Sequence, residues 1–323
     1  MFRLLVAFAA FALPLSLACG DGPEDEVTLM LDWTPNTHHI GVYVAQEKGW
    51  YEDVGLTVKI VEPAQGGVEQ IVGAGQVEFG VSVQENVIPA RAAEIPIISI
   101  AAIKQHNDSS LVSLSSEGIA RPRDLEGRTY GGFGGPLEIA LIEQLVSCDG
   151  GDPDQVKFAQ IGNVDYLVGL EDDLYDIVWI FEGWDAIRYR DLEQKQISSL
   201  KFIDWLKCIP DWYTPLLIAN EQMLADEPEL VESFLEATAR GYAFAIENPS
   251  EAAAILIEAV PELNEDLVSL STAYHTTRFM DPGRKWGRQD EDVWVAFEVF
   301  LREAGLTDVE VDVGLAFTNE FLP

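Results

Sequence analysis

Short apolar runs alternate with longer amphipathic stretches along most of the chain, and this alternation constrains its fold more than any other feature. Runs of four to eight apolar and β-branched residues are typical of strands, and the stretches between them have the apolar spacing of helices. The expected strands cover residues 27–31, 56–61, 78–81, 96–103, 128–131, 156–161 and 176–181. Strand–helix–strand units of this kind predict parallel pairing with right-handed crossovers, so the expected fold class is α/β.

The arrangement of these segments predicts two lobes with a ligand cleft between them. Residues 27–115 together with 218–323 are expected to form lobe 1, and residues 116–217 to form lobe 2. The chain after Pro228 is mainly helical, with a final amphipathic helix over 293–301. An inserted middle lobe makes the chain cross between lobes twice, and ligand sites favour clefts of this kind.

Residues 1–18 are typical of an export signal. Arg3 is the only charged side chain before an apolar run over residues 4–17, which is too short to span a bilayer. The segment Ser16-Leu17-Ala18-Cys19-Gly20 resembles a bacterial lipobox, and this predicts a lipid anchor on Cys19 at the outer face of the cell membrane. The alternative is an ordinary secretory signal. Residues 19–26 are interpreted as an acidic tether.

The charge balance is strongly acidic. Twenty Lys and Arg residues stand against 55 Asp and Glu residues, which gives a formal net charge of -35. A field of this sign repels nucleic acid and anionic lipid, so no nucleic-acid partner is expected. We interpret the acidity as a device for solubility, with a cationic partner as the alternative.

Two cysteines, Cys148 and Cys208, follow the signal region. Their spacing fits no metal signature, and an oxidising exterior would allow one disulfide between them. Two buried free thiols are the favoured interpretation.

Motifs that carry catalysis are scarce. The chain has no Gly-x-Ser-x-Gly, no phosphate-binding loop ending in Gly-Lys-Ser/Thr and no His-Glu-x-x-His. His38 and His39 are adjacent, but no acidic residue or cysteine lies at ligand spacing nearby, so no metal site is expected. The glycines of residues 131–135 lie between a strand and a helix. Their backbone amides could hold a polar ligand group, or the glycines could serve only a tight turn.

Aromatic residues gather where the expected strands end and the lobes cross. They are Trp33, Trp179, Phe181, Trp184, Trp205, Trp212 and Tyr213, with Glu182 among them. Flat rings and one carboxylate suit a planar heterocycle that is stacked and hydrogen-bonded. The alternative for each ring is packing in the core.

Several motifs together resemble one known family. They are residues 31–41 (LDWTPNTHHIG), 44–51 (VAQEKGWY), 130–138 (YGGFGGPLE), 181–183 (FEG) and 318–322 (TNEFL). The chain resembles thiamine pyrimidine-precursor binding proteins and the related pyrimidine synthases over nearly all of its length after the signal. A group of riboflavin-binding lipoproteins is also similar.

The resemblance implies a type 2 periplasmic-binding-protein fold whose two lobes close on the ligand by a hinge motion. It also implies an ABC permease and its ATPase as partners, a small planar vitamin or precursor as ligand, no cofactor and a monomeric chain. The ligand is expected to be a thiamine pyrimidine precursor, with riboflavin as the alternative. The expected ligand-binding residues are Trp33, Asn36, His39, Ser82, Gln84, Glu85, Asn86, Gly132, Gly134, Gly135, Glu138, Trp179, Glu182 and Tyr213.

The resemblance includes enzymes, and their motifs can be checked in this chain. Where the synthases carry their lysine and histidine, the chain has Ser82 and Asn86, and where they have a cysteine cluster it has the single Cys208. A Schiff base needs a lysine amine. The sequence therefore predicts that the chain is not an enzyme. A surface adhesion or sensory protein with the same fold is a further alternative.

Overall fold

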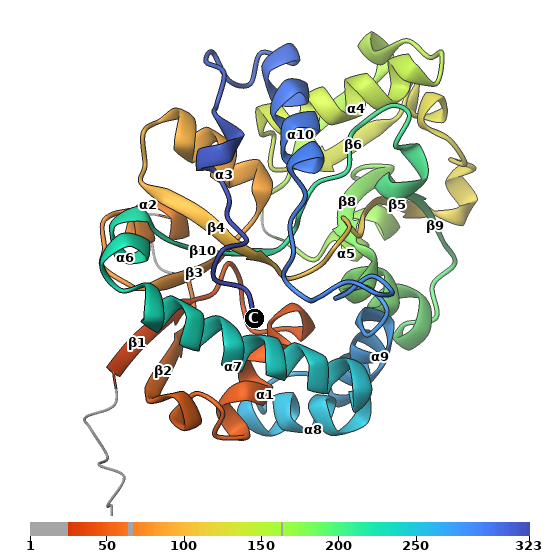
Figure 1. Cartoon of the computed structure of the whole chain (residues 1–323). Helices are drawn as coiled ribbons and strands as arrows, with labels where there is room; N and C mark the ends of the chain where they lie inside the picture. Colours follow the sequence, from red (N-terminus) through yellow and green to blue (C-terminus); the bar gives the residue numbers. More distant parts are fainter. Residues whose placement is uncertain (1–24, 64–66, 163) are drawn as a thin grey trace, which may run out of the picture.

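Two five-stranded sheets, A and B, lie side by side in the computed structural model, which describes residues 25–63, 67–162 and 164–323 (Figure 1). Sheet A has the order β2 (Leu56–Val61), β1 (Asp25–Met30), β3 (Phe79–Ser82), β10 (Leu216–Asn220), β4 (Ile97–Ala102). Sheet B has the order β7 (Lys157–Gln160), β6 (Thr129–Gly132), β8 (Ile177–Phe181), β5 (Ser109–Leu114), β9 (Ile197–Lys201).

Helices cover both sheets. The α-helices are α1 (Ile40–Glu47), α2 (Val68–Gly73), α3 (Gln84–Ala92), α4 (Pro136–Cys148), α5 (Tyr166–Glu171), α6 (Glu221–Asp226), α7 (Pro228–Glu247), α8 (Pro249–Ala259), α9 (Glu265–His275) and α10 (Glu291–Glu303). Short 3-10 turns are η1 (Thr37–His39), η2 (Glu52–Val54), η3 (Ser115–Glu117), η4 (Pro122–Leu125), η5 (Pro153–Gln155), η8 (Phe202–Trp205) and η9 (Val313–Leu315). Two π-helical turns, η6 (Glu182–Ala186) and η7 (Arg188–Leu192), follow β8.

The α/β fold class is confirmed, but the pairing is mixed rather than all parallel. Strands β1, β2 and β3 pair in parallel, as do β6, β7 and β8. Strand β10 runs antiparallel to β3 and β4, and β5 runs antiparallel to β8 and β9. These antiparallel strands are the ones by which the chain passes from one sheet to the other, and the sequence pattern did not predict β5, β9 or β10.

The chain crosses between the sheets through residues 103–108 and 202–215. Strand β5 belongs to sheet B, although its residues fall within the range expected for lobe 1. We propose that the lobes follow the sheets, which places the first crossing before β5 and the second before β10.

The buried core has three parts. One packs α1, α7 and α8 on a face of sheet A, where Tyr51 and Phe79 stack on Phe234. A second joins the two sheets through α10, whose Trp294 and Phe297 are fully buried. A third lies under α5 and η7 on the other face of sheet B. The middle part therefore connects the lobes, and aromatic residues of the second crossing such as Trp212 belong to it.

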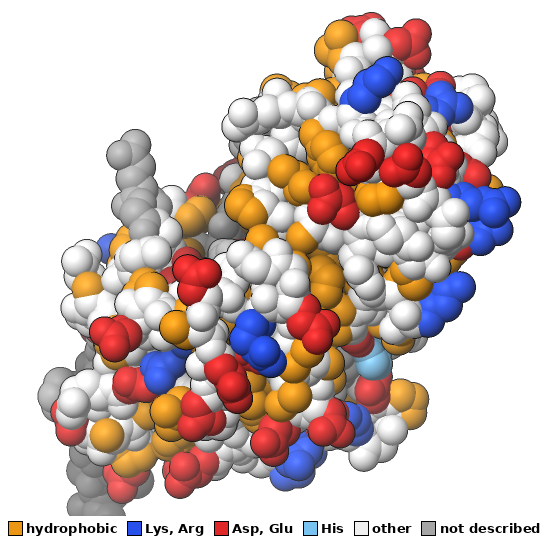
Figure 2. Space-filling model, turned by 90° about the horizontal axis from the view of Figure 1, so that it is seen from above, with side chains coloured by type: hydrophobic (Ala, Val, Ile, Leu, Met, Phe, Trp, Pro, Cys, Tyr) orange, Lys and Arg blue, Asp and Glu red, His pale blue; other side chains and the backbone are white. Residues whose placement is uncertain are grey.

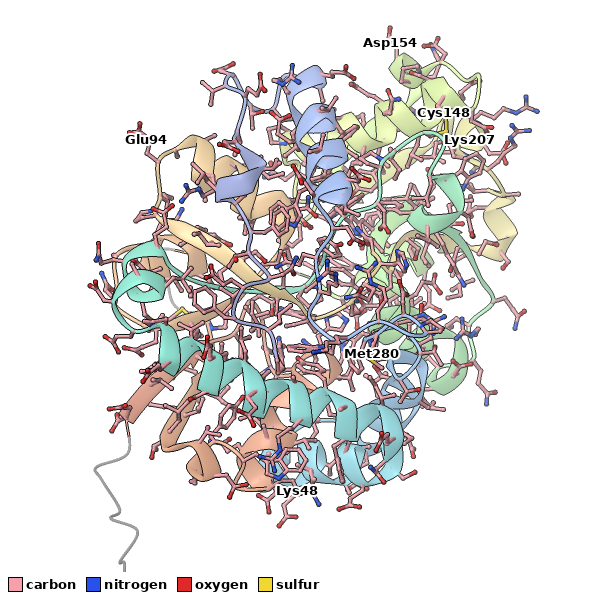
Figure 3. All side chains as sticks on the ribbon, viewed as in Figure 1. Lys48, Glu94, Cys148, Asp154, Lys207 and Met280 are labelled. Atoms are coloured by element: carbon pink, nitrogen blue, oxygen red, sulfur yellow. A yellow bond between two sulfur atoms is a disulfide. The ribbon has the colours of Figure 1, made fainter. Side chains whose placement is uncertain are left out.

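Cys148 and Cys208 form a disulfide, so the interpretation of two free thiols is wrong. The end of α4 and the segment after η8 bring their Cα atoms to 5.5 Å, which is a normal bridging distance. Figure 3 shows Cys148 beside Lys207, the residue that precedes Cys208.

The amino-terminal predictions fall mostly outside the described residues. The signal over 1–18 and the anchor at Cys19 lie there, whereas Asp25 and Glu26, which were assigned to the tether, begin β1. Within the described ranges, no helix is both long and apolar enough to cross a membrane. Acidic side chains are spread over the face seen in Figure 2 rather than gathered in one patch.

Candidate functional site

The carboxyl ends of neighbouring parallel strands bring the first group of site residues together. Strands β1 and β3 are adjacent and parallel, with Met30 opposite Gly80, so Asp32, which follows β1, and Ser82, which ends β3, lie at the same edge of sheet A. Open α/β sheets bind ligands at this edge.

The turn after β1 is built by Asn36, which caps η1. Its Oδ1 accepts from the backbone amide of His38 at 2.8 Å, and its own amide donates to His39 Nδ1 at 3.3 Å. His39 Nε2 lies 2.8 Å from Asp32 Oδ1, and the His39 side chain is fully buried. The structure therefore uses Asn36 and His39 to hold this turn, and the Asp32 carboxylate is the partly exposed member of the group.

Two features leave Asp32 and Trp33 available to a ligand. Burial alone would raise the pKa of Asp32, but the hydrogen bond from His39 and the nearby histidines lower it overall, so Asp32 stays ionised. Trp33 is 42% exposed, which is unusual for its size. A flat exposed ring beside a carboxylate can stack and orient a heterocycle.

The end of β3 carries a second polar group. Ser82 Oγ donates to Glu69 Oε1 at 2.5 Å, and Asn86 Nδ2 donates to the same oxygen at 3.2 Å. Glu69 lies in α2 and is buried. Ser82 and Asn86 therefore share one carboxylate that the sequence interpretation did not include.

Glu85 lies near both of these groups, within electrostatic reach of Asp32 and Glu69. Burial raises its pKa to about 8, with smaller contributions of the same sign from Asp32 and Glu69. Glu85 Oε2 and Trp212 Nε1 are both buried, and neither finds a hydrogen-bond partner among the described residues. At neutral pH this carboxyl group is mostly protonated and can donate a hydrogen bond.

Gln84 and Tyr213 have structural partners. The backbone amide of Tyr213 donates to Gln84 Oε1 at 2.8 Å, and the amide of Gln84 donates to the Tyr213 carbonyl at 2.9 Å. The Tyr213 hydroxyl accepts from the amide of Asp290 at 2.8 Å. These two residues join the start of α3, the second crossing and the start of α10.

On sheet B, the glycine turn lies at the same edge as the end of β8, because β6 and β8 are adjacent and parallel. Glu138 closes this turn: its Oε1 accepts from Tyr130 Oη and from the Phe133 amide, and its Oε2 accepts from the Gly135 amide at 3.0 Å. Gly134 has φ of 79°, a conformation that favours glycine. The amides of this turn are thus largely bound by Glu138, and Gly132 lies against its carboxylate.

Glu182 begins the turn after β8 and is nearly fully buried. Its Oε1 accepts from Ser110 Oγ at 2.8 Å, and Lys201 Nζ lies 3.8 Å from its Oε2. Trp179 on the same strand packs against Phe202 at 5.1 Å and Trp212 at 6.3 Å between ring centroids. The Trp179–Trp212 contact links the strand end of sheet B to the crossing that borders Glu85.

The residues of the candidate site therefore fall into two sets. Asp32, Trp33, Ser82, Glu85 and Asn86 lie at the edge of sheet A, while Glu138, Trp179 and Glu182 lie at the corresponding edge of sheet B. The sequence interpretation missed Asp32, Glu69, Ser110 and Lys201. Of these four, only Asp32 could have been identified from the sequence, because it is a charged residue directly after an expected apolar strand.

A separate buried polar cluster joins His38, Lys104, Asp108 and His275. Burial lowers the pKa of His275 to about 3 and that of His38 well below its usual value, with Lys104 adding to both shifts. Burial also lowers the pKa of Lys104, which Asp108 opposes. The sequence has no acidic residue at ligand spacing from His38, but the fold brings Asp108 and His275 to it, and the absence of a metal site stays an untested prediction.

Two cavities lie apart from the residues expected to bind ligand. One of about 490 Å³ is at the opposite ends of β1 and β3, near Glu78 and Asn220. The other, of about 370 Å³, lies between Pro35, Tyr43 and Val260 behind the turn that carries Trp33. None of the expected site residues lines either one, so we do not assign the ligand to them.

The pattern of the NMT1/THI5-like family matches residues 36–252. This range contains the Asn36 cap, the Ser82 and Glu85 edge, the glycine turn and Glu182, in the order in which the fold uses them. The chain belongs to the NMT1/THI5-like family.

Relatives of two kinds align with this family member over almost its whole length. A 4-amino-5-hydroxymethyl-2-methylpyrimidine phosphate synthase of Legionella pneumophila is 27% identical over 311 residues, 93% of each chain. A formylaminopyrimidine-binding protein of Halalkalibacterium halodurans is 27% identical over 305 residues, 91% of each chain.

Solved structures with the same fold include periplasmic binding proteins. The aliphatic sulphonate binding protein SsuA of Escherichia coli has a TM-score of 0.70 and 13% identity, covering 90% of this chain and 91% of its own. The alkanesulfonate-binding protein SsuA of Xanthomonas axonopodis has a TM-score of 0.69 and 11% identity, covering 92% and 99%. At this identity the likeness shows the fold, which confirms the periplasmic-binding-protein architecture.

One prediction is corrected by the relatives. The sequence predicts that the chain is not an enzyme, because Ser82 and Asn86 replace the lysine and histidine of the synthases. That exclusion is wrong as stated, since enzymes from Legionella and from fungi align with the family member as extensively as the binding protein does. The family contains both kinds of protein, and the chain resembles them equally.

Proposed function

We propose that the protein captures a thiamine pyrimidine precursor as the substrate-binding component of an ABC importer. The observation that carries this proposal is the exposed ring of Trp33 next to the ionised carboxylate of Asp32 at the strand edge of sheet A. The similarity to a formylaminopyrimidine-binding protein over 91% of the chain supports the ligand class. Riboflavin is the alternative ligand, because an isoalloxazine ring needs the same flat walls and polar edges.

Each side chain has a role in this proposal that its setting supports. Trp33 stacks on the ring of the ligand, and ionised Asp32 accepts a hydrogen bond from its amino group. Protonated Glu85 donates to a ring nitrogen. The acceptor Asp32 and the donor Glu85 follow the neighbouring strands β1 and β3. Glu182, which Ser110 and Lys201 hold in place, closes over the ligand from sheet B. The crossings at 103–108 and 202–215 act as the hinge.

The cellular setting follows from the same proposal. The signal at residues 1–18 exports the chain, Cys19 carries the lipid anchor, and the acidic segment keeps the lobes away from an anionic membrane. The monomeric protein then delivers the ligand to a permease and its ATPase.

The test is a calorimetric titration of the chain from Asp21 onward with formylaminopyrimidine, 4-amino-5-hydroxymethyl-2-methylpyrimidine, thiamine and riboflavin. Binding of the pyrimidines alone supports the proposal, and binding of riboflavin alone assigns the alternative. Heat from none of the four rejects this ligand class.

A Glu182→Ala variant tests the sheet B side of the site. We expect the affinity for the pyrimidine to fall by about 1–3 kcal/mol, because the ligand's donors then lose a buried partner. Glu143→Ala is the matched control, since Glu143 is exposed on α4 in the same lobe. Unchanged affinity in the Glu182 variant removes this residue from the site.

A further inference from the structure

Four buried polar side chains meet between η1, α9 and the first crossing. His38 lies in η1, Lys104 and Asp108 lie in the crossing, and His275 ends α9. All four are less than a tenth exposed, and Lys104 and His275 are fully buried. One ring nitrogen of each histidine and one carboxylate oxygen of Asp108 lie within 4.8 Å of one another.

Several polar atoms of this cluster are unsatisfied. Asp108 Oδ2 and both ring nitrogens of His275 are buried, and they find no hydrogen-bond partner among the residues that the structure describes. A neutral imidazole carries one donor and one acceptor, and leaving such groups buried and unpaired costs about 1–3 kcal/mol each. Native structures keep few groups of this kind, and those that persist commonly face an ion or water.

The types of these side chains point to the class of ion. Two imidazoles and one carboxylate form the ligand set preferred by Zn²⁺ and similar divalent transition ions, whereas Mg²⁺ and Ca²⁺ prefer oxygen alone. Ligand atoms around tetrahedral Zn²⁺ lie about 3.4 Å apart for bonds of about 2.1 Å. Side-chain rotations have to close the observed spread of up to 4.8 Å to this size for all three to bind one ion.

We propose that His38, Asp108 and His275 bind one divalent transition-metal ion. The three ligands come from the helical side of lobe 1 and from the crossing into sheet B. The site also borders the turn after β8, since a Cβ atom at Gly183 would overlap the His275 ring. A bound ion therefore fixes α9 and η1 against the segment that leads into lobe 2.

Lys104 is the competitor for this ion. Its Nζ donates to Asp108 Oδ1 and lies 3.2 Å from His38 Nε2, so a positive charge already contacts two of the three ligands. The ion has to displace this ammonium group from Asp108 and His38. Removing the ammonium group should therefore strengthen metal binding. In a cluster that serves only to bury an ion pair, the same change would instead lower the stability of the fold.

The experiment uses the chain from Asp21 onward, carrying a tag without histidine and freed of metal by chelation. Zn²⁺ is titrated by calorimetry and Co²⁺ by its visible absorption. We expect the unmodified chain to bind one equivalent of metal ion. The variants His275→Gln and Asp108→Asn should lose this binding, and Lys104→Met should bind the ion at least tenfold more tightly. His106→Gln is the matched control. His106 is a half-exposed histidine with Nδ1 2.5 Å from Asp211 Oδ2, and its loss should leave binding unchanged.

Two outcomes overturn the proposal. Absence of binding to both the unmodified chain and Lys104→Met shows that the cluster holds no metal. Binding that is lost in His106→Gln but kept in His275→Gln shows an adventitious surface site. If the ligand variants do not fold, the melting temperature of Lys104→Met decides, because Zn²⁺ must raise it and Mg²⁺ must not. None of these readouts involves the organic ligand, so failure here leaves the proposed function standing.

Discussion

His39 Nε2 donates a hydrogen bond to Asp32 Oδ1 across 2.8 Å, while its Nδ1 accepts from the backbone amide of Asn36. Because the amide can only donate, Nδ1 carries no proton, and the proton lies on Nε2, facing the carboxylate. The histidine that the family motif suggests as a ligand residue therefore positions Asp32, and Asp32 is the residue with an oxygen left for a ligand.

Replacing Asp32 by asparagine tests this relationship. We expect Asp32→Asn to lower the free energy of unfolding by about 1–2 kcal/mol, since a charge-assisted hydrogen bond becomes a neutral one. It should also weaken pyrimidine binding about tenfold. Chemical denaturation and calorimetry measure the two effects, and Asp308→Asn in the exposed segment after α10 is the control. Equal ligand affinity in both variants would show that Asp32 serves the fold alone.

Trp33 is expected to supply the stacking surface. Truncation in Trp33→Ala should cost about 1–3 kcal/mol of binding energy, the range found when an aromatic ring that stacks on a base is removed. Trp33→Phe, which keeps a flat ring, should recover most of the affinity. Because the ring is 42% exposed, neither change should move the melting temperature by more than a degree or two. Calorimetry is the suitable measurement, since the fluorescence of the seven other tryptophans would mask a change at this position. An alanine variant that binds as tightly as the phenylalanine variant contradicts the stacking role.

The sequence pattern predicted the six strands that pair in parallel, together with β4, but not the antiparallel strands β5, β9 and β10. β2 covers the expected residues 56–61, and β1, β3, β4, β6, β7 and β8 match within two residues at each end. β9 reads ISSLK, and only Leu200 in it is buried, so its apolar signal is weak. β10 reads LLIAN and is buried along its first four residues, a pattern shared with buried helices. Local sequence could not decide the direction in which these strands pair.

The sequence could locate site residues that end or closely follow a predicted strand. It could not locate residues that reach the site from distant parts of the sequence. Trp33 and Glu182 follow or end strands that the pattern locates, so their position at a sheet edge could be expected. Glu69 meets Ser82 through a helix packed on the strand, and Lys201 meets Glu182 from β9. These contacts depend on strand order and helix packing, which no local motif encodes. The same reason explains why the disulfide and the His38–His275 contact were missed.

Glu85 should make stability depend on pH. Its folded pKa of about 8 lies above its ordinary value of 4.5, so the folded state holds the proton more tightly than the unfolded state. Between pH 4.5 and 8 the unfolded chain releases this proton first, and stability falls as pH rises. Glu85→Gln cannot ionise and should remove this component, so that the variant gains about 1–3 kcal/mol over the original chain at pH 8 but little at pH 4.5.

The measurement is the difference in melting temperature between the two proteins at each pH, so that other titrating groups cancel. Glu94→Gln is the control, since Glu94 points away from the protein in Figure 3. A constant difference from pH 4.5 to pH 8 would mean that Glu85 ionises normally in the folded state.

The disulfide should contribute strongly to the stability of the lobe built on sheet B. Cys148 and Cys208 are 60 residues apart, and the loop between them contains β7, α5, β8 and β9. Closing a loop of this length removes entropy from the unfolded chain worth about 4 kcal/mol in the chain-entropy treatment. The double variant Cys148→Ser/Cys208→Ser should therefore unfold at a clearly lower guanidinium concentration than the original chain. Reductant should lower the midpoint of the original chain to that of the variant and leave the variant unchanged. Equal midpoints without reductant would mean that the two cysteines are not joined in the folded protein.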